Sequence, residues 1–203
     1  MRKERLFGIF SRIPTLETDR IILRGMKVGD TDDMFDYARR ADVTRFLTWR
    51  PHRDRSYTKQ YLEYLGTRYA AGDFYDWAVV LRSENRMIGT CGFTRIDLSN
   101  NSGEIGYVIN PDYSGMGIAT EAAARVLDFG FRELSLHRIE ARHMAGNGAS
   151  HRVMEKLGMT EEGTFRESYL VNGKYRTVTI CSILDTEYRE LCDKNIQFCE
   201  KKS

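Results

Sequence analysis

The sequence has almost no excess of charge of either sign, no closely paired cysteines and no long apolar run. Its 31 lysines and arginines are balanced by 29 aspartates and glutamates, too even a balance to indicate a surface that binds a phosphate backbone. The four cysteines include no Cys-x-x-Cys pair, which argues against a zinc ribbon or a dithiol redox motif. No apolar run approaches the roughly 18 residues of a membrane span, and residues 6–10 are too short for a signal peptide. We therefore expect a cytoplasmic protein without membrane or direct nucleic-acid contacts.

The remaining composition is that of a folded domain. Hydrophobic residues make up 41% and charged residues 30% of the 203 residues, which is the balance of a globular chain and not of a disordered one. This length fits one domain with a substantial core, and no internal repeat or low-complexity linker divides it. We expect one mixed α/β domain over residues 18–185, an N-terminal extension over 1–17 and a charged C-terminal tail over 186–203.

The hydrophobic patterns predict alternating groups of strands and helices. Apolar helical spacing predicts helices over 31–40, from an N-cap at Ser56 to a stop at Gly72, over 117–134 and over 149–157. The strands 77–81, 87–96 and 104–109 follow one another through short polar turns, which is typical of an antiparallel meander. Asn172-Gly173 separates two later strands and is a hairpin signal. The full set of predicted strands is 20–24, 77–81, 87–96, 104–109, 138–144, 160–171 and 175–184.

The most informative segment is a small-residue loop between a strand and a helix. Ser114-Gly115-Met116-Gly117 lies where backbone N–H groups can close around a pyrophosphate, assisted by the dipole of the following helix. A Walker loop would need Gly-Lys-Ser/Thr, and a Rossmann fingerprint would need a third glycine where Thr120 stands. For this pattern alone, an ordinary glycine-rich turn before a helix remains an alternative.

Two segments together resemble a known family. Residues 113–122 read Tyr-Ser-Gly-Met-Gly-Ile-Ala-Thr-Glu-Ala, and residues 147–159 read Asn-Gly-Ala-Ser-His-Arg-Val-Met-Glu-Lys-Leu-Gly-Met. In order and spacing they resemble the GNAT (Gcn5-related N-acetyltransferase) superfamily, in particular its ribosomal-protein-alanine N-acetyltransferase group. The family's loop, Arg/Gln-x-x-Gly-x-Gly/Ala, is matched by Gly117 and Ala119, while Ser114 stands at its first position.

This resemblance implies a fold and a cosubstrate. The family has a central, mostly antiparallel sheet flanked by helices, and the sheet splays in the middle so that the pantetheine arm of acetyl-CoA slots between two strands. The resemblance assigns acetyl-CoA binding to the backbone of two strand residues, to the loop and helix start, and to the asparagine of the second motif. These residues are Val108, Ile109, Ser114, Gly115, Met116, Gly117, Ile118, Ala119, Thr120 and Asn147.

Acetyl transfer to an amine needs a base for the ammonium, stabilisation of an oxyanion and a proton for the departing thiolate. Glu104 stands where the family often has the base, and Ser150 is the candidate acid. For Glu104 the alternative is an ordinary charge at a strand edge. For Asn147 and Ser150 the alternative is simple capping of the helix that follows.

Trp49 and Tyr61 are candidates for the acceptor pocket, because the N-terminal region supplies that side of the site in relatives. Packing in the core explains their positions equally well. His137, His143 and His151 share no metal-ligand spacing, and we expect no metal.

The leading hypothesis is therefore an acetyl-CoA-dependent N-acetyltransferase, acting as a monomer or homodimer. The amine would attack directly in a ternary complex, since neither motif contains a cysteine that could carry the acetyl group. The acceptor is either a protein N-terminus, as of a ribosomal protein, or a small amine such as a polyamine, amino acid or drug. Ser114 and Thr177 depart from the family pattern and keep open a non-catalytic acyl-CoA-binding module. A nucleic-acid-binding hairpin around 174–176 is a third alternative that the charge balance disfavours.

Overall fold

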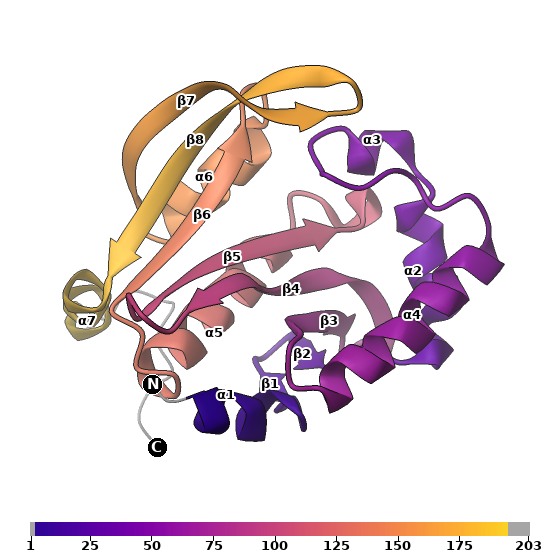
Figure 1. Ribbon diagram of the computed structural model, residues 1–203, viewed down its shortest axis with the longest axis horizontal. Coiled ribbons are helices and arrows are strands. Elements are labelled where there is room, and N and C mark those ends of the chain that lie inside the picture. Colours follow the sequence, from indigo (N-terminus) through magenta and orange to yellow (C-terminus); the bar gives the residue numbers. More distant parts are fainter. Residues whose placement is uncertain (1–2, 195–203) are drawn as a thin grey trace.

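A computed structural model describes residues 3–194, which form one eight-stranded sheet with helices on both faces (Figure 1). The strand order is β1-β2-β3-β4-β5-β6-β8-β7, and all neighbours are antiparallel except β5 and β6. This confirms the predicted meander, hairpin and mostly antiparallel mixed sheet. The strands are β1 Leu16–Glu17, β2 Ile21–Arg24, β3 Tyr75–Leu81, β4 Arg86–Asp97, β5 Ser102–Ile109, β6 Arg138–Met144, β7 Thr160–Val171 and β8 Lys174–Leu184.

The helices follow the predicted order, with short additions. The helices are α1 Lys3–Phe10, α2 Thr31–Ala38, α3 Ala41–Thr44, α4 Arg55–Ala70, α5 Ile118–Arg132, α6 Gly148–Lys156 and α7 Asp185–Asp193, with 3-10 turns η1 Val28–Asp30 and η2 Pro111–Tyr113. The N-cap of α4 is Asp54 and not Ser56, because the Asp54 carboxylate accepts a 2.7 Å hydrogen bond from the backbone N–H of Tyr57. Over residues 3–194, no helix combines the length and the apolar character of a membrane span.

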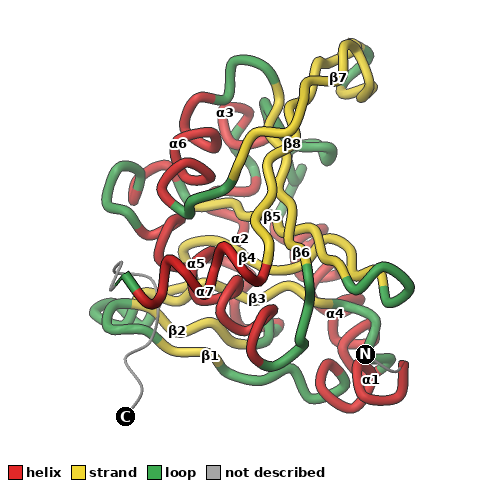
Figure 2. The backbone as a smooth tube through the Cα atoms, turned by 90° about the vertical axis from the view of Figure 1, so that its left-hand side faces the viewer, coloured by secondary structure: helices red, strands yellow, loops and turns green. Residues whose placement is uncertain are grey.

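Each face of the sheet carries its own hydrophobic core. Along β3, Trp77 and Val79 belong to the core under α5 and α1, whereas Ala78 and Val80 belong to the core under α2 and α4. This alternation follows from the two-residue period of a strand. We call the two sides the α5 face and the α4 face; in Figure 2, α5 lies left of centre and α4 lies to the right.

Both ends of the described chain pack onto the domain. Phe10 of α1 is fully buried, and its ring meets Tyr75, Trp77 and Phe129 edge-on at centroid distances of 4.7, 5.7 and 6.1 Å. In α7, Tyr188 is buried and donates a 2.6 Å hydrogen bond to Asp128 of α5. Part of the expected 1–17 extension and part of the expected tail therefore contribute to the core, while residues 195–203 lie outside the described residues.

The sheet opens between its two parallel strands. Pairing of β5 with β6 runs only from Ser102 opposite Arg138 to Ile105 opposite Ala141. Beyond that point β5 continues to Ile109 along β4, and β6 continues to Met144 along β8. The splay that the family resemblance implied is thus present, and it leaves a gap in pairing between residues 106–109 and 142–144.

Candidate active site

The predicted phosphate loop lies at the end of the strand that borders the splay. Residues 114–117 are exposed between η2 and α5, and Gly115 and Gly117 both have φ of +78°. Only glycine adopts this left-handed conformation without strain, which explains both positions. Gly117 is also the N-cap of α5, so the free N–H groups of the first helical turn follow directly. The loop has the form of an anion-binding site.

The loop is held by contacts that the sequence patterns did not indicate. The Arg20 guanidinium donates to the Met116 carbonyl at 2.9 Å and, through Nε, to the Glu121 carboxylate at 2.6 Å. The Thr18 hydroxyl donates to the same carboxylate at 2.5 Å. These contacts join the strand region before β2 to the first turn of α5, so the chain's beginning positions the loop.

Among the other predicted coenzyme residues, two point their side chains into the protein. Ile118 and Thr120 are 1% and 7% exposed, so only their backbone groups are available to a ligand. Ala119, between them, is partly exposed at the start of α5.

Backbone groups of β5 face the splay at alternate residues. The N–H of Asn110 donates to Ile88 of the β4 side at 2.7 Å, and hydrogen-bonded pairs alternate along antiparallel strands. The backbone of Val108 therefore faces β4, whereas that of Tyr107 and Ile109 faces the opening. The expected coenzyme contact of the Val108 backbone therefore does not fit this pairing, and the side chain of Val108 packs against the α4-face core.

A hydrogen-bonded pair joins β5 to α6 across this opening. The Tyr107 hydroxyl lies 3.0 Å from the Ser150 Oγ and donates to the Ser150 carbonyl at 3.1 Å. Burial raises the pKa of Tyr107, so its phenol stays protonated near neutral pH. Asn147 Oδ1 accepts the Ser150 N–H at 3.3 Å as the helix N-cap, which leaves the Asn147 NH₂ donors outside the cap. The geometry is thus compatible with helix capping by these residues and also with coenzyme binding by Asn147 and acid catalysis by Ser150.

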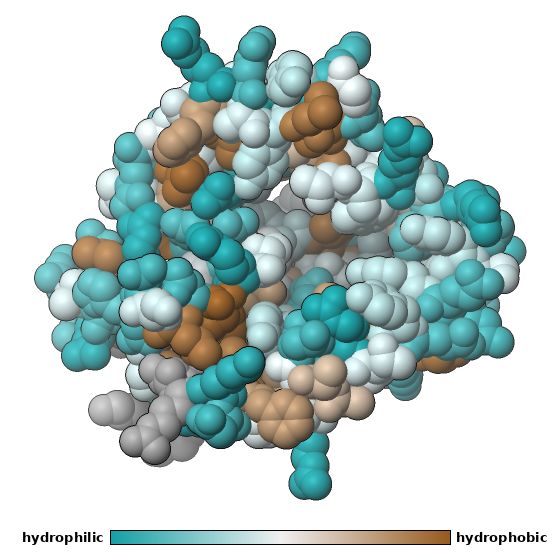
Figure 3. All heavy atoms as spheres, viewed as in Figure 1, coloured by the Kyte–Doolittle hydropathy of each residue, from teal (hydrophilic) through white to brown (hydrophobic). Residues whose placement is uncertain are grey.

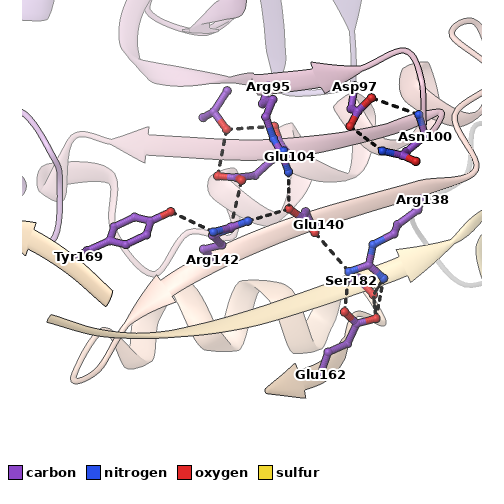
Figure 4. Close-up of polar contacts among 11 residues, drawn as sticks. Arg95, Asp97, Asn100, Glu104, Arg138, Glu140, Arg142, Glu162, Tyr169 and Ser182 are labelled. Carbon is purple, nitrogen blue, oxygen red and sulfur yellow. Dashed lines mark hydrogen bonds and ion pairs between the residues drawn. The ribbon is translucent and has the colours of Figure 1, made fainter. Parts of the chain in front are cut away.

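Glu104 lies on the α4 face inside a network of charged groups (Figure 4). Its carboxylate contacts Arg142 Nε at 3.1 Å and accepts a 3.2 Å hydrogen bond from Thr94. Arg142 also donates to Glu140 at 3.0 Å and to the Tyr169 hydroxyl at 3.1 Å. Burial acts to raise the pKa of Glu140, but hydrogen bonds from Arg142 and Arg138 outweigh it and lower that pKa. The carboxylate of Glu104 is therefore fixed in place beside a cation.

A second carboxyl group lies on the same face. Asp76 of β3 is opposite Gly92, and Gly92 is opposite Gly106 of β5, so neither residue between Asp76 and the splay carries a side chain. A Cβ on Gly92 would come within 2.8 Å of Asp76 Oδ1. Burial raises the pKa of Asp76 to about 7, although Thr90 and the Trp77 N–H donate hydrogen bonds to it. A carboxyl group that titrates near neutral pH suits proton transfer.

The sequence reasoning missed Asp76 and gave little weight to Tyr107. An available signal for Asp76 was an ionisable residue inside the otherwise apolar strand Tyr75–Leu81. No comparable signal existed for Tyr107, because a strand tyrosine usually serves packing.

Aromatic side chains from the N-terminal half border this face. Trp49 and Tyr61 both pack against His52, with ring centroids 5.5 and 5.7 Å away, and both contact the same core cluster as Val108. Burial raises the pKa of Tyr61 to about 12. The structure thus brings the two predicted acceptor residues together on the α4 face. The surface in Figure 3 is recessed at its centre, between the β7–β8 side and the α3–α4 side.

Comparison with known proteins identifies the family that has this architecture. Residues 20–160 match the family model described as an acetyltransferase (GNAT) domain. An uncharacterised N-acetyltransferase p20 from Bacillus licheniformis is 32% identical over 86% of this chain and 98% of its own length. The [ribosomal protein uS5]-alanine N-acetyltransferase of Escherichia coli is 25% identical over 90% of this chain and 98% of its own length. A GNAT-family acetyltransferase structure from Bacillus anthracis superposes with a TM-score of 0.76 at 29% identity, covering 86% of this chain and 100% of that one. With this loop, this splay and these relatives, the chain belongs to the GNAT family of N-acetyltransferases.

Proposed function

We propose that this protein transfers the acetyl group of acetyl-CoA to the α-amine of a protein N-terminus, by direct attack within a ternary complex. The observation that carries the proposal is the unpaired β5 edge at residues 106–109, which leads directly into the Gly115–Gly117 loop. A strand edge that accepts an extended pantetheine arm, next to an anion site for the pyrophosphate, matches the shape of acetyl-CoA.

In this proposal each group of the site has a defined role. The loop N–H groups bind the pyrophosphate, and the backbone of Tyr107 and Ile109 binds the pantetheine amides. A carboxylate on the α4 face, Asp76 or Glu104, accepts a proton from the acceptor ammonium. The neutral amine nitrogen then forms a bond to the thioester carbonyl carbon, and collapse of the tetrahedral adduct breaks the carbon–sulfur bond. The CoA thiolate leaves with a proton donated by the Ser150 hydroxyl, which takes a proton from the Tyr107 hydroxyl, and a proton from solvent then restores the phenol.

A protein acceptor is favoured by exposed apolar residues of the β7–β8 hairpin and by one relative. Three large apolar residues of the β7–β8 hairpin, Phe165, Leu170 and Tyr175, are 53–65% exposed, and exposed apolar patches mark interaction surfaces. The relative that covers 90% of this chain at 25% identity is named for acetylating an alanine of ribosomal protein uS5. This supports an N-terminal alanine as the first acceptor to test.

The test is release of free CoA thiol from acetyl-CoA in the presence of three acceptors. These are a peptide with a free N-terminal alanine, the same peptide with a blocked N-terminus and an internal lysine, and a polyamine. We expect turnover only with the free N-terminus, and a mass increase of one acetyl group located there by fragmentation. Turnover with the polyamine alone would replace the proposal by a small-amine activity. Binding of acetyl-CoA without turnover of any acceptor would indicate a non-catalytic module.

A further inference from the structure

Two histidines and a cysteine that are far apart in the sequence come together on the α5 face. On that face β6 pairs with β8 so that Ala141 lies opposite Cys181, and His143, two residues further, shares the same side of the sheet. His151 reaches this point from α6, which lies behind β6 in Figure 1. The His143 and His151 rings are 5.0 Å apart between centroids. One ligand atom from each of the three residues lies within 4.8 Å of the other two.

The polar atoms in this cluster are poorly satisfied by the protein. Within residues 3–194, the buried Nε2 of His143 and the buried Nδ1 of His151 have no hydrogen-bond partner. Cys181 is 2% exposed and its thiol is free. Buried polar atoms without a partner are rare in folded proteins and often mark a bound ion. Two such nitrogens beside a buried thiol therefore indicate a binding site for an ion.

The opposite ring nitrogens have the contacts that metal-binding histidines usually have. His151 Nε2 lies 3.4 Å from the Glu155 carboxylate, and His143 Nδ1 lies 3.4 Å from the Met144 carbonyl. A histidine that binds a metal through one nitrogen typically donates its other N–H to a carboxylate or carbonyl, which orients the ring. The unpartnered nitrogens, His143 Nε2 and His151 Nδ1, can therefore be the unprotonated ones.

We propose that His143, His151 and Cys181 bind one zinc ion, with a fourth position left for a water molecule or another ligand. Two imidazole nitrogens and a thiolate form a donor set that suits this borderline-soft ion. A tetrahedral zinc site needs donor atoms about 3.3 to 3.6 Å apart, so the widest separation must shrink by about 1 Å through side-chain rotation. On binding, the Cys181 thiol loses its proton to solvent and the sulfur bonds the ion.

The cluster borders the proposed coenzyme site, because His143 lies in the stretch 142–144 beside the splay, and α6 also links the two. His151 follows Ser150 directly, and Asn147 begins the same helix. A zinc ion would thus tie the helix that carries these two residues to β6 and β8. The proposal does not depend on acetyl transfer, and its test uses binding and spectroscopy alone.

The experiment is a cobalt titration of the full-length chain without an affinity tag, freed of metal by chelation and kept reduced with a phosphine. Wild-type protein should bind one equivalent of Co²⁺ with a thiolate-to-cobalt charge-transfer band and the intense visible bands of tetrahedral cobalt, and Zn²⁺ should abolish both. Cys181→Ser should remove the charge-transfer band, and His151→Gln should weaken Co²⁺ binding at least about 100-fold, since changes outside the ligand set already cost 10–100-fold.

Matched controls come from the same chain. His137→Ala alters an exposed histidine that contacts Asp185, and Cys91→Ala removes the other free buried thiol of residues 3–194; both variants should retain the cobalt spectrum and affinity. Absence of a stoichiometric cobalt complex in the wild-type protein would overturn the proposal, whether or not the variants fold. A charge-transfer band that persists in Cys181→Ser would overturn it as well.

Discussion

At the scale of single residues, the sequence position of Asp76 does not reveal how its environment changes the pKa of its carboxyl group. It lies between aromatic residues of the α4 face, and burial raises its pKa to about 7. The charge of Asp76 in turn contributes to the raised pKa values of Tyr37, Tyr61 and Tyr69, which lie on α2 and α4. Glu104, the base that family resemblance indicates, is instead held by Arg142.

We predict that Asp76→Asn removes the acidic limb of the pH–rate profile. In the wild-type protein kcat/KM should rise with pH and level off above about 7, where Asp76 is ionised. The variant should lose activity by about 10²–10⁴-fold and lack that limb. Asp73→Asn, which breaks only an exposed contact with Arg68, should keep it. If Glu104→Gln removes the limb and Asp76→Asn does not, Glu104 is the base.

Asp76→Asn should lower activity but raise the stability of the folded protein at alkaline pH. The pKa of Asp76 is raised in the folded protein, so its stabilising contribution is complete below the unfolded pKa of about 4 and is lost as pH rises through about 7. Asp76→Asn should therefore unfold at a higher urea concentration than wild type at pH 8, and with little difference at pH 4. Lower stability of the variant at pH 8 would contradict the raised pKa.

Ser150 and Tyr107 act as a pair in our proposal. We predict that Ser150→Ala lowers kcat by about 10–100-fold with little change in KM for acetyl-CoA, because general-acid assistance of the leaving thiolate is lost. Tyr107→Phe should lower kcat in the same direction, and the double variant should be little worse than Ser150→Ala, since coupled groups are not additive. Ser56→Ala, at an exposed α4 position, is the control. Unchanged kcat in Ser150→Ala would restrict this serine to a structural role.

At the scale of elements, our proposal assigns coenzyme binding to the junction between β5 and α5. We predict that Gly117→Val weakens acetyl-CoA binding by at least about tenfold in calorimetry, because valine disfavours the left-handed conformation and turns the loop N–H groups away. Gly173→Val is the matched control: Gly173 has φ of +74° in the β7–β8 hairpin, and a Cβ there meets nothing within 4 Å. Equal affinities of the two variants would contradict the loop assignment.

The elements were largely predictable because their signals are local. Alternating apolar residues, the Asn172-Gly173 turn and the alanine-rich helix each depend on residues close together in the sequence. Helix α3 has four residues, too few for periodicity to appear. The N-cap of α4 was misplaced because Asp54 and Ser56 are both good caps, and only the backbone conformation selects between them.

At the scale of the whole molecule, the N-terminal helix is part of the main core. We predict that Phe10→Ala lowers the free energy of unfolding by about 3–5 kcal/mol, the cost of removing a fully buried aromatic ring. Phe7→Ala, whose side chain is 51% exposed on the same helix, should cost under about 1 kcal/mol. Urea denaturation would compare the two variants, and equal unfolding midpoints would show that α1 does not contribute to the core.

The sequence alone determined the family, the order of the elements and the position of the glycine-containing loop, because these depend on residue identities and on spacings within about a dozen positions. Only the tertiary structure decided which distant groups meet: Arg20 with Glu121, Tyr107 with Ser150, and His143 and His151 with Cys181. It also placed Asp76 where burial raises the pKa of its carboxyl group to about 7. Burial and pairing arise from strand register and from the packing of helices on the sheet, which no local pattern specifies.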